Sequence, residues 1–267
     1  MKIPITMCHG IRNEGNNPLT VKHLDTLVSI ASEMGFNSIT YDDLANWFNN
    51  DTNLPKNPIM LDFDHPMKNI LDEVNPILAN YGYVGNLFMY TKPYDNCYTK
   101  NLPWDTTAHH LTWDELRSLK DLGWTIGAHT ISHPNLSDLS IEDPTGEQLR
   151  VELERSNQTI KDNLGFYPRE FAFTGTSWSK AAEQEVKKHY RFGRLWIIGS
   201  SYTADGKDIR YADLVGVDGS DEPDGGPPNK SRYITESSDK YKLPSMELQA
   251  LIYEPSKFRR YLEMASE

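Results

Sequence analysis

Short apolar stretches alternate with amphipathic stretches along most of the chain, and no other feature restricts the possible folds as strongly. In the first unit, KIPITM (residues 2–7) predicts a strand, and the stretch that follows predicts a helix with Thr20 as its N-cap and Gly35 as its C-terminal stop. Such alternation specifies parallel strands that are joined by crossover helices. We therefore expect an α/β fold built on a parallel sheet.

Comparable units recur through the sequence. Further strands are predicted at 36–40, 57–63, 84–90, 124–128, 169–173 and 192–199, and further helices at 41–48, 67–82, 112–123, 145–165, 180–190 and 256–267. About seven units, without a glycine-rich phosphate loop after the first strand, favour a distorted (β/α) barrel over a doubly wound nucleotide-binding fold. The chain, 1–267, then forms a single domain. The stretch from about 199 to 245 loses the alternation and is rich in Gly, Pro and Asp, so it predicts a loop-rich excursion.

The charge of the chain restricts its partners. The formal net charge is −11 and the sequence has no cluster of Lys and Arg, which argues against a nucleic-acid surface. A neutral small molecule or a glycan fits better. The N-terminal apolar run is too short for a signal peptide, and no stretch reaches the roughly 18 apolar residues of a membrane span. We expect a cytoplasmic protein, or an exported one if a leader segment was removed before the first residue.

Two polar clusters, MLDFDHP and GAHTISHPNL, stand where predicted strands end. In a barrel of parallel strands, the carboxyl ends of the strands share one face, and active sites assemble there. Asp64 and His65 follow one strand, and His129 and His133 follow another, about 65 positions later. The fold therefore allows the two clusters to converge in space.

The spacing of His129 and His133 suits a divalent cation, because residues four apart can present two imidazoles on one side of a turn. Pro134 disfavours helical geometry for His133, so we expect a loop or a single turn there. Two imidazoles, one further ligand and an open position describe a catalytic metal site, with His65 as the candidate third ligand. The alternative is that the pair arose by chance among eight histidines and is structural or exposed.

Asp62 and Asp64 lie two positions apart in a predicted strand. Side chains alternate between the faces of a strand, so both carboxylates are expected on the same face. Two like charges at this distance need a cation between them, which is either a metal ion or an arginine side chain. The sequence leaves both possibilities open.

Several segments of the chain resemble successive segments of one known family. They are ITMCHGI (5–11), MGFNSITYDDLANWF (34–48), NPIMLDFDHP (57–66), VNPILANYGYVGNLFMYT (74–91) and LTWDELRSLKDLGWTIGAHTISHPNLSDLS (111–140). The family is the polysaccharide deacetylases, metal-dependent carbohydrate esterases that remove N- or O-acetyl groups from sugars. The resemblance covers most of the chain up to about residue 200, and its last segment is the most specific.

The first motif of that family, Thr-Phe-Asp-Asp-Gly, corresponds to DFDHP in this chain. The resemblance implies that Asp64 is the catalytic base and that His65 replaces the metal-ligating Asp. His65, His129 and His133 would then hold a divalent cation, zinc in first place and cobalt or nickel as alternatives. A neutral ligand in place of an anion leaves more positive charge on the metal, which Asp62 partly offsets.

Two further parts of the family's machinery have less direct counterparts here. The third motif is altered to FAFTGTSW, and the arginine that pairs with the base corresponds best to Arg194, with Arg169 in reserve. The late histidine that serves as general acid in many members has no match. His9, at the end of the first strand, is the candidate for that role. Each of these residues has a structural alternative as a packing or surface residue.

The resemblance implies a hydrolase of carbon–nitrogen bonds other than peptide bonds, which removes acetyl groups from N-acetylated or O-acetylated sugars of a poly- or oligosaccharide. In that reaction the metal activates water, Asp64 accepts its proton, and an acid protonates the departing amine. The partner is an acetylated glycan or another small molecule. Two alternatives stay open: hydrolysis of a non-sugar amide or imide on the same fold, and a catalytically inactive glycan-binding homologue. A purely structural barrel would leave the Asp and His clusters unexplained.

Overall fold

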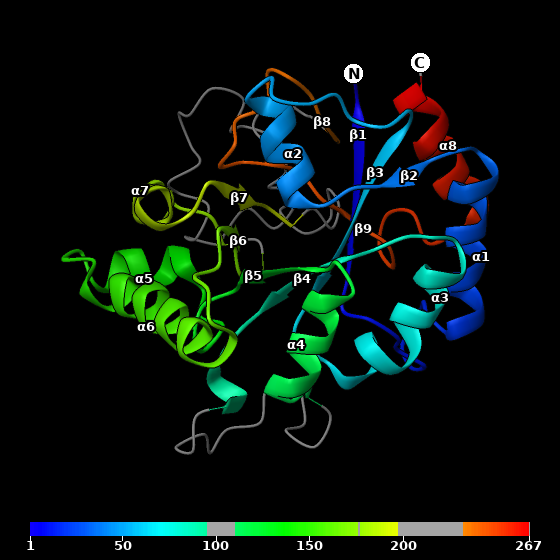
Figure 1. Ribbon diagram of the computed structural model, residues 1–267. Helices are drawn as coiled ribbons and strands as arrows, with labels where there is room; N and C mark the ends of the chain where they lie inside the picture. Colours follow the sequence, from blue (N-terminus) through cyan, green and yellow to red (C-terminus); the bar gives the residue numbers. More distant parts are fainter. Residues whose placement is uncertain (95–109, 176, 197–231, 267) are drawn as a thin grey trace.

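The alternation of strands and helices that the sequence predicts is present in the structure (Figure 1). The computed structural model describes residues 1–94, 110–175, 177–196 and 232–266. The strands within these ranges are β1 (Ile3–Cys8), β2 (Asn37–Ser38), β3 (Pro58–Asp64), β4 (Asn86–Met89), β5 (Thr125–Ala128), β6 (Glu170–Ala172), β7 (Phe192–Arg194), β8 (Tyr233–Ile234) and β9 (Met246–Glu247). The α-helices are α1 (Val21–Glu33), α2 (Tyr41–Phe48), α3 (Asn75–Asn80), α4 (Trp113–Asp121), α5 (Leu136–Glu142), α6 (Glu147–Leu164), α7 (Lys180–His189) and α8 (Pro255–Ser266).

The strands form one curled sheet, which confirms the predicted distorted (β/α) barrel. The path of the sheet is β7-β6-β5-β4-β3-β1-β8, with β2 paired to β3 and β9 paired to β1. Among the described strands, the pairing of β8 with β1 is antiparallel and the other pairings are parallel. Figure 1 shows α1, α3 and α8 on one side of the strands and α5, α6 and α7 on the opposite side.

A segment near the C-terminus joins the two sides of the curled sheet. The backbone N–H of Leu195, just after β7, donates to the carbonyl of Leu243 (2.8 Å), and Leu243 in turn donates to Gly193 (3.0 Å). Four residues after Leu243, Glu247 pairs in parallel with Met7 of β1. The segment that ends in β9 therefore links β7 to β1.

The excursion expected at about 199–245 is described only in its last part. Residues 197–231 lie outside the described residues. The described remainder is not loop throughout, because Tyr233–Ile234 pairs with β1 as β8 and Leu243 bonds to the β7 strand. The short strand β8 was not among the predicted elements, since two-residue strands leave too short a pattern to be found in a sequence.

The interior and the exterior of the barrel are lined by alternate residues of β3. Leu61 and Phe63 belong to a large apolar cluster that the surrounding helices share, and Met60 belongs to a smaller cluster on the opposite face. Asp62 and Asp64 continue the face of Met60, and both are almost completely buried. The predicted placement of the two carboxylates on one face is therefore confirmed, and that face is the barrel interior.

Helix boundaries follow the capping signals in the sequence. The Thr20 side chain accepts a hydrogen bond from the first turn of α1 (3.1 Å), as predicted. Thr40 with Asp43, and Thr112 with Glu115, form capping boxes at the starts of α2 and α4, in which each side chain satisfies a backbone N–H of the other. These caps fix the points at which the chain turns back toward the sheet.

The helix predicted at 67–82 is irregular and contains a π-helical turn. Residues Ile70–Val74 form a π-helical turn, and α3 begins beside Pro76, which cannot donate a backbone hydrogen bond. A 3-10 turn, Lys92–Tyr94, follows β4. Helix α5 was not predicted, because its seven residues are too few to show a clear period.

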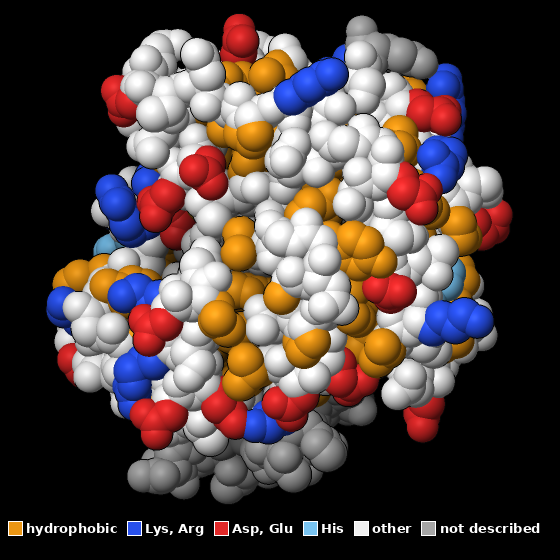
Figure 2. Space-filling view, turned by 45° about the vertical axis from the view of Figure 1, so that its right-hand side comes forward, with side chains coloured by type: hydrophobic (Ala, Val, Ile, Leu, Met, Phe, Trp, Pro, Cys, Tyr) orange, Lys and Arg blue, Asp and Glu red, His pale blue; other side chains and the backbone are white. Residues whose placement is uncertain are grey.

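Charged groups of both signs are interspersed on the face of the molecule shown in Figure 2, between separate apolar side chains. A span of the membrane would need a long apolar helix, and the described part of the chain has none.

Leu119→Ala should lower the free energy of unfolding by about 2–5 kcal/mol, because it empties a filled space between α4 and the sheet. Leu119 is 0% exposed, whereas Leu122 at the end of the same helix is 53% exposed. Leu122→Ala is the matched control and should change the free energy by less than about 0.5 kcal/mol. Urea denaturation followed by circular dichroism measures both. Equal losses in the two variants would contradict the packing of α4 described above.

Candidate metal centre

The strands β3 and β5 place the predicted site residues at the carboxyl end of the sheet, on either side of β4. Asp64 is the last residue of β3, and the backbone N–H of His65 donates to the carbonyl of Phe88 in β4 (2.9 Å). On the other side of β4, the N–H of His129 donates to Met89 (2.9 Å). These bonds continue the parallel ladders past the strand ends, so His65 and His129 flank the same neighbouring strand.

The three histidines expected to bind a metal lie together. One ligand atom from each of His65, His129 and His133 can be chosen so that all lie within 4.8 Å of one another. The ring centroids of His133 are 4.9 Å from His65 and 4.8 Å from His129, with the rings steeply tilted. The structure thus brings the two sequence clusters into one group, as predicted.

The loop between His129 and His133 is held by a carboxylate from α6. The side chain of Glu152 accepts hydrogen bonds from the backbone N–H groups of Ile131 and Ser132, both at 2.9 Å, and from the Ser132 hydroxyl at 2.6 Å. His133 follows in a non-helical segment, as Pro134 predicted. This anchoring fixes the direction in which the second histidine of the pair points.

The backbone of the site is strained at three residues. His65, Thr130 and His133 have φ angles of 72°, 71° and 57°, a left-handed region that side chains with a Cβ seldom adopt. Hydrogen bonds offset the cost: Ser156 Oγ donates to the carbonyl of Thr130 (3.0 Å), and the N–H of His133 donates to Thr130 Oγ1 (3.0 Å). Strain of this kind occurs at sites where the chain must aim a particular side chain.

Two of the three imidazoles carry a buried nitrogen without a protein partner. His129 Nδ1 donates to the carbonyl of Ala172 (2.8 Å), so in the neutral ring Nε2 is an acceptor, and this Nε2 is buried without a hydrogen bond. His65 Nε2 is likewise buried and unpartnered. Burial and the neighbouring cationic groups hold the pKa of both histidines well below its usual value. Neutral rings with unused lone pairs fit a divalent cation.

Arg194 supplies the cation that the two aspartates of β3 need. It is fully buried, its Nη2 contacts Asp64 Oδ1, and its Nε lies 3.3 Å from Asp62 Oδ2. Nη1 donates to Ser245 Oγ (3.3 Å). The reserve candidate Arg169 instead has a side chain that is 67% exposed, 4.0 Å from Asp42, and makes a surface ion pair. The sequence left open whether a metal ion or an arginine lies between Asp62 and Asp64, and in the structure an arginine pairs with both.

Asp62 is enclosed by hydrogen-bond donors as well as by Arg194. Tyr41 Oη donates to its Oδ2 (2.7 Å), and Asn86 Nδ2 donates to its Oδ1 (3.1 Å). Burial nevertheless raises the pKa of Asp62 to about 7, against the opposing effect of Arg194 and of the Tyr41 hydrogen bond. The carboxyl group therefore changes charge near neutral pH.

His9 lies beside the histidine cluster. Its ring is 4.7 Å from the ring of His65 and 5.6 Å from that of Trp196, edge to face in both cases. Burial lowers the pKa of His9 to about 3, although Asp64 opposes this shift. The structure places His9 at the site that the sequence predicts for it. Its role as general acid stays a prediction.

Two residues at the carboxyl end of the sheet, Tyr90 and Glu247, were not predicted from the sequence to belong to the site. Tyr90, directly after β4, has its ring 5.0 Å from His65, and its hydroxyl is 3.0 Å from His110 Nε2. Glu247, the last residue of β9, is 5% exposed and accepts a hydrogen bond from Trp196 Nε1 (3.1 Å). The available signal for Glu247 was one acidic residue between two apolar ones, Met246 and Leu248.

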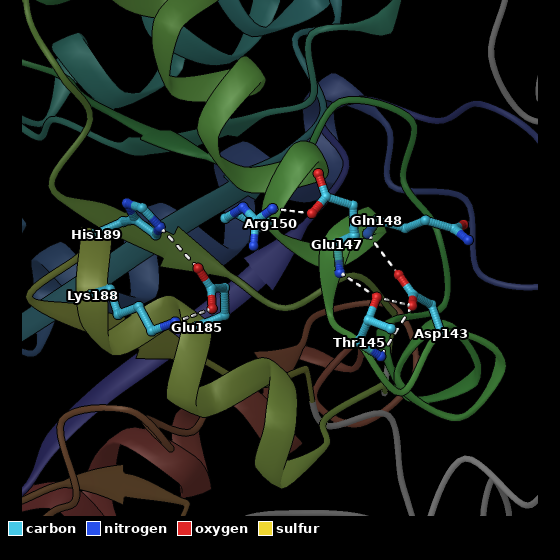
Figure 3. Close-up of polar contacts among 8 residues, drawn as sticks. All are labelled: Asp143, Thr145, Glu147, Gln148, Arg150, Glu185, Lys188 and His189. Atoms are coloured by element: carbon cyan, nitrogen blue, oxygen red, sulfur yellow. Dashed lines mark hydrogen bonds and ion pairs between the residues drawn. The ribbon is translucent and has the colours of Figure 1, made fainter.

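A second cluster of metal-binding residue types carries no site. Glu154, Glu185 and His189 lie near one another on α6 and α7. Figure 3 shows Lys188 and His189 both directed at the Glu185 carboxylate, and His189 Nε2 is 3.3 Å from it. The carboxylate is thus already paired, and Glu154 is exposed to solvent. Such groups are ordinary at a helix surface.

A protein-family comparison agrees with the resemblance described above. The sequence profile of the family described as "Polysaccharide deacetylase" matches residues 51–191. These are 141 of 267 residues, which is more than half of the chain. The matched segment contains the clusters around His65 and His129.

Individual relatives are distant in sequence. A Bacillus subtilis (strain 168) protein named "Putative polysaccharide deacetylase YxkH" is 23% identical over 163 residues, which is 61% of this chain and 52% of the relative. The chain thus matches about half the length of that relative.

Solved structures are similar over nearly the whole chain. The Streptococcus pyogenes deacetylase PplD, solved in complex with acetate, has a TM-score of 0.71 at 15% identity and covers 98% of each chain. The deacetylase domain of BpsB from Bordetella bronchiseptica has a TM-score of 0.69 at 15% identity, over 92% of this chain and 95% of that one. At such identities the likeness establishes the fold.

Asp62→Asn should remove a pH-dependent part of the stability. The folded-state pKa of Asp62 is about 7, above the value of about 3.9 for an unfolded chain. The folded form therefore retains a proton that the unfolded form releases. The stabilisation is fully present below pH about 4 and is lost as the pH rises through 7, with ~1.4 kcal/mol for each unit of pKa difference. The Asn variant should show a flatter fall in the free energy of unfolding across this interval.

Urea denaturation at half-unit pH steps measures this slope. Asp121→Asn is the matched control, because Asp121 is exposed at the end of α4, and this variant should keep the slope of the unmodified protein. Parallel curves for Asp62→Asn and the unmodified protein would refute the assignment of a raised pKa to Asp62.

Proposed function

We propose that this chain, which belongs to the polysaccharide deacetylase family, is a metal-dependent hydrolase that removes acetyl groups from N-acetylated or O-acetylated sugars. One observation carries the proposal. Two buried imidazole nitrogens without partners, on His65 and His129, lie together with His133 next to the ion pair of Asp64 and Arg194. His65, His129 and His133 supply the ligands, and the ion pair with Arg194 holds the carboxylate of Asp64 in position.

The residues present fit a divalent cation held by His65, His129 and His133. Imidazole is a good ligand for zinc, and also for cobalt and nickel, so zinc is our first choice of metal. When bound, such a cation supplies Lewis-acid polarisation of the acetyl carbonyl and raises the acidity of the attacking water. The hydrogen bond from His129 Nδ1 to Ala172 orients that ring toward the cluster.

Asp64 is the residue that we assign as general base. It is buried at the end of β3, next to His65 in sequence, and the contact with Arg194 holds its carboxylate in one place. A carboxylate that is held rigidly near the attacking water can take its proton without reorganising during the reaction. Arg194 acts through Asp64 and is therefore a positioning residue.

The alternative of an inactive glycan-binding homologue loses one of its two reasons. It rested on the lack of an obvious arginine for the base and on the lack of a general acid. Arg194 contacts Asp64, so an arginine is in place. Hydrolysis of a non-sugar amide or imide would use the same residues, and a substrate comparison separates it from sugar deacetylation.

Asp64→Asn should retain bound zinc but lose acetate release from N-acetylated chito-oligosaccharides, by about 100-fold or more, because the base is removed and the ligands are kept. His129→Ala should lose both zinc and acetate release, since it removes one of three ligands. Zinc content by plasma mass spectrometry and acetate by an enzyme-coupled assay measure the two effects separately.

His23→Ala is the control for a histidine outside the cluster, because its Nε2 is bonded to the carbonyl of Tyr253 (2.7 Å) far from the site. This variant should keep both zinc and activity. Near-normal acetate release by Asp64→Asn would show that the base is another group. Release from a simple amide or imide, with none from acetylated sugars, would favour the second hydrolase class.

A further inference from the structure

We infer that Glu247 is the general acid that protonates the departing amine of the sugar, an inference that rests on the deacetylase function proposed above. Glu247 ends β9, the short strand of the segment that links β7 to β1. Its side chain is 5% exposed. Its position in the sheet, its contacts and the charges around it support this role.

The sheet register directs Glu247 into the barrel interior. Met7 of β1 pairs in register with Asp62 on one side and with Glu247 on the other. In neighbouring parallel strands, residues in register point to the same face, as in the residue layers of a barrel. Asp62 points inward, where it meets Arg194. Glu247 therefore points inward too, one layer below Asp64.

A short line of aromatic side chains connects Glu247 with the histidine cluster. Trp196 Nε1 donates a hydrogen bond to Glu247 Oε2 (3.1 Å), the ring of Trp196 is 5.6 Å from that of His9, and His9 is 4.7 Å from His65. The hydrogen bond from Trp196 fixes the orientation of the carboxyl group. Glu247 thus lies on the same side of the site as His9.

The charges around Glu247 favour its protonated form. Arg194 forms ion pairs with Asp62 and Asp64, whereas no ion pair of Glu247 is found among the described residues. Burial, reinforced by the charge of Asp64, raises the pKa of Glu247 to about 8, against the opposing effects of hydrogen bonds from the Gln249 backbone and Trp196 and of the charge of Arg12. The site therefore combines the carboxyl group of Asp64, which is paired with Arg194, and that of Glu247, whose raised pKa favours its protonated form. Two acids in contrasting surroundings are the usual arrangement for a base and an acid.

The proposed proton transfers balance over one turnover. Water loses one proton to Asp64, and its oxygen forms a bond to the acetyl carbon, which gives a tetrahedral oxyanion. Glu247 then donates its proton to the amide nitrogen while the carbon–nitrogen bond breaks and the carbonyl reforms. The products are acetic acid and the free sugar amine. Loss of the proton from Asp64 to solvent and uptake of one by Glu247 restore the starting state.

The test compares two leaving groups in the zinc-loaded full chain. Glu247→Gln should lower acetate release from N-acetylated chito-oligosaccharides by about 100-fold or more, because an amine leaves slowly without a proton. The same variant should hydrolyse 4-nitrophenyl acetate at nearly the unmodified rate, since nitrophenolate leaves without one. Zinc content should be unchanged. A purely structural role for Glu247 would instead lower both activities together.

The pH profile gives a second readout. Activity on the amide should fall as the pH rises through about 8, where Glu247 loses its proton, and the residual activity of Glu247→Gln should lack this fall. The charged groups that shift the pKa of Glu247 are Asp64 and Arg12, and the charge of Glu247 in turn raises the pKa of Cys8. Glu247→Asp keeps a carboxyl group, so it should retain part of the amide activity and a high-pH fall. This variant also keeps the test valid if the Gln variant folds poorly.

Glu183→Gln is the matched control. Glu183 is also buried and also accepts a hydrogen bond from a tryptophan, Trp178 Nε1 (2.9 Å), but it lies on α7. This variant should keep both activities.

Full amide activity in Glu247→Gln would overturn the assignment of Glu247 as the general acid. So would a loss of activity in His9→Gln that is confined to the amide substrate. Either result would leave the proposed deacetylase function standing. Failure of the unmodified, zinc-loaded protein to release acetate from either substrate would overturn the proposed function and this inference together.

Discussion

A buried arginine that crosses the barrel interior is the interaction on which the arrangement of the site depends. Arg194 lies on β7, and its two carboxylate partners, Asp62 and Asp64, lie on β3, which is four strands away along the sheet path. Such a contact exists only if the sheet curls. A guanidinium group buried without anions would cost several kcal/mol, as would either carboxylate alone. The same ion pairs therefore set the curvature of the sheet and the position of Asp64. A hydrogen bond from Arg194 to Ser245 also ties the segment that ends in β9 to this group.

The sequence predicted the features that depend on local patterns. The barrel followed from strand–helix alternation, and the convergence of His65, His129 and His133 followed from their places after strands. Arg194 could only be offered beside Arg169, because nothing local tells which arginine crosses the interior. Glu247 was missed for a related reason. Its strand has two residues, too few for a period, and its partner in β1 lies about 240 positions earlier.

Strain in the loop of the histidine pair is balanced by the helix that follows. Thr130 and His133 adopt left-handed backbone angles, which isolated chains rarely populate. Glu152 accepts the two backbone N–H groups of the residues between them, and Ser156, one turn later in α6, donates to the carbonyl of Thr130. Helix α6 thus serves the site without contributing a ligand. This also explains why a helix-like spacing of histidines occurs here in a loop.

The departure of DFDHP from the family motif conserves charge but moves it. Thr-Phe-Asp-Asp-Gly contains two carboxylates, and so does this segment. His65 stands at the position of the ligating Asp of the motif, and Asp62 stands at the position of the Thr. One carboxyl group has therefore moved from the position of the ligand to the barrel interior, where Tyr41, Asn86 and Arg194 surround it. A cation held by neutral imidazoles keeps more of its positive charge. Asp64 keeps its place beside Arg194 in this arrangement, so the residue that we propose as the base is held next to a cation whose charge its ligands do not neutralise.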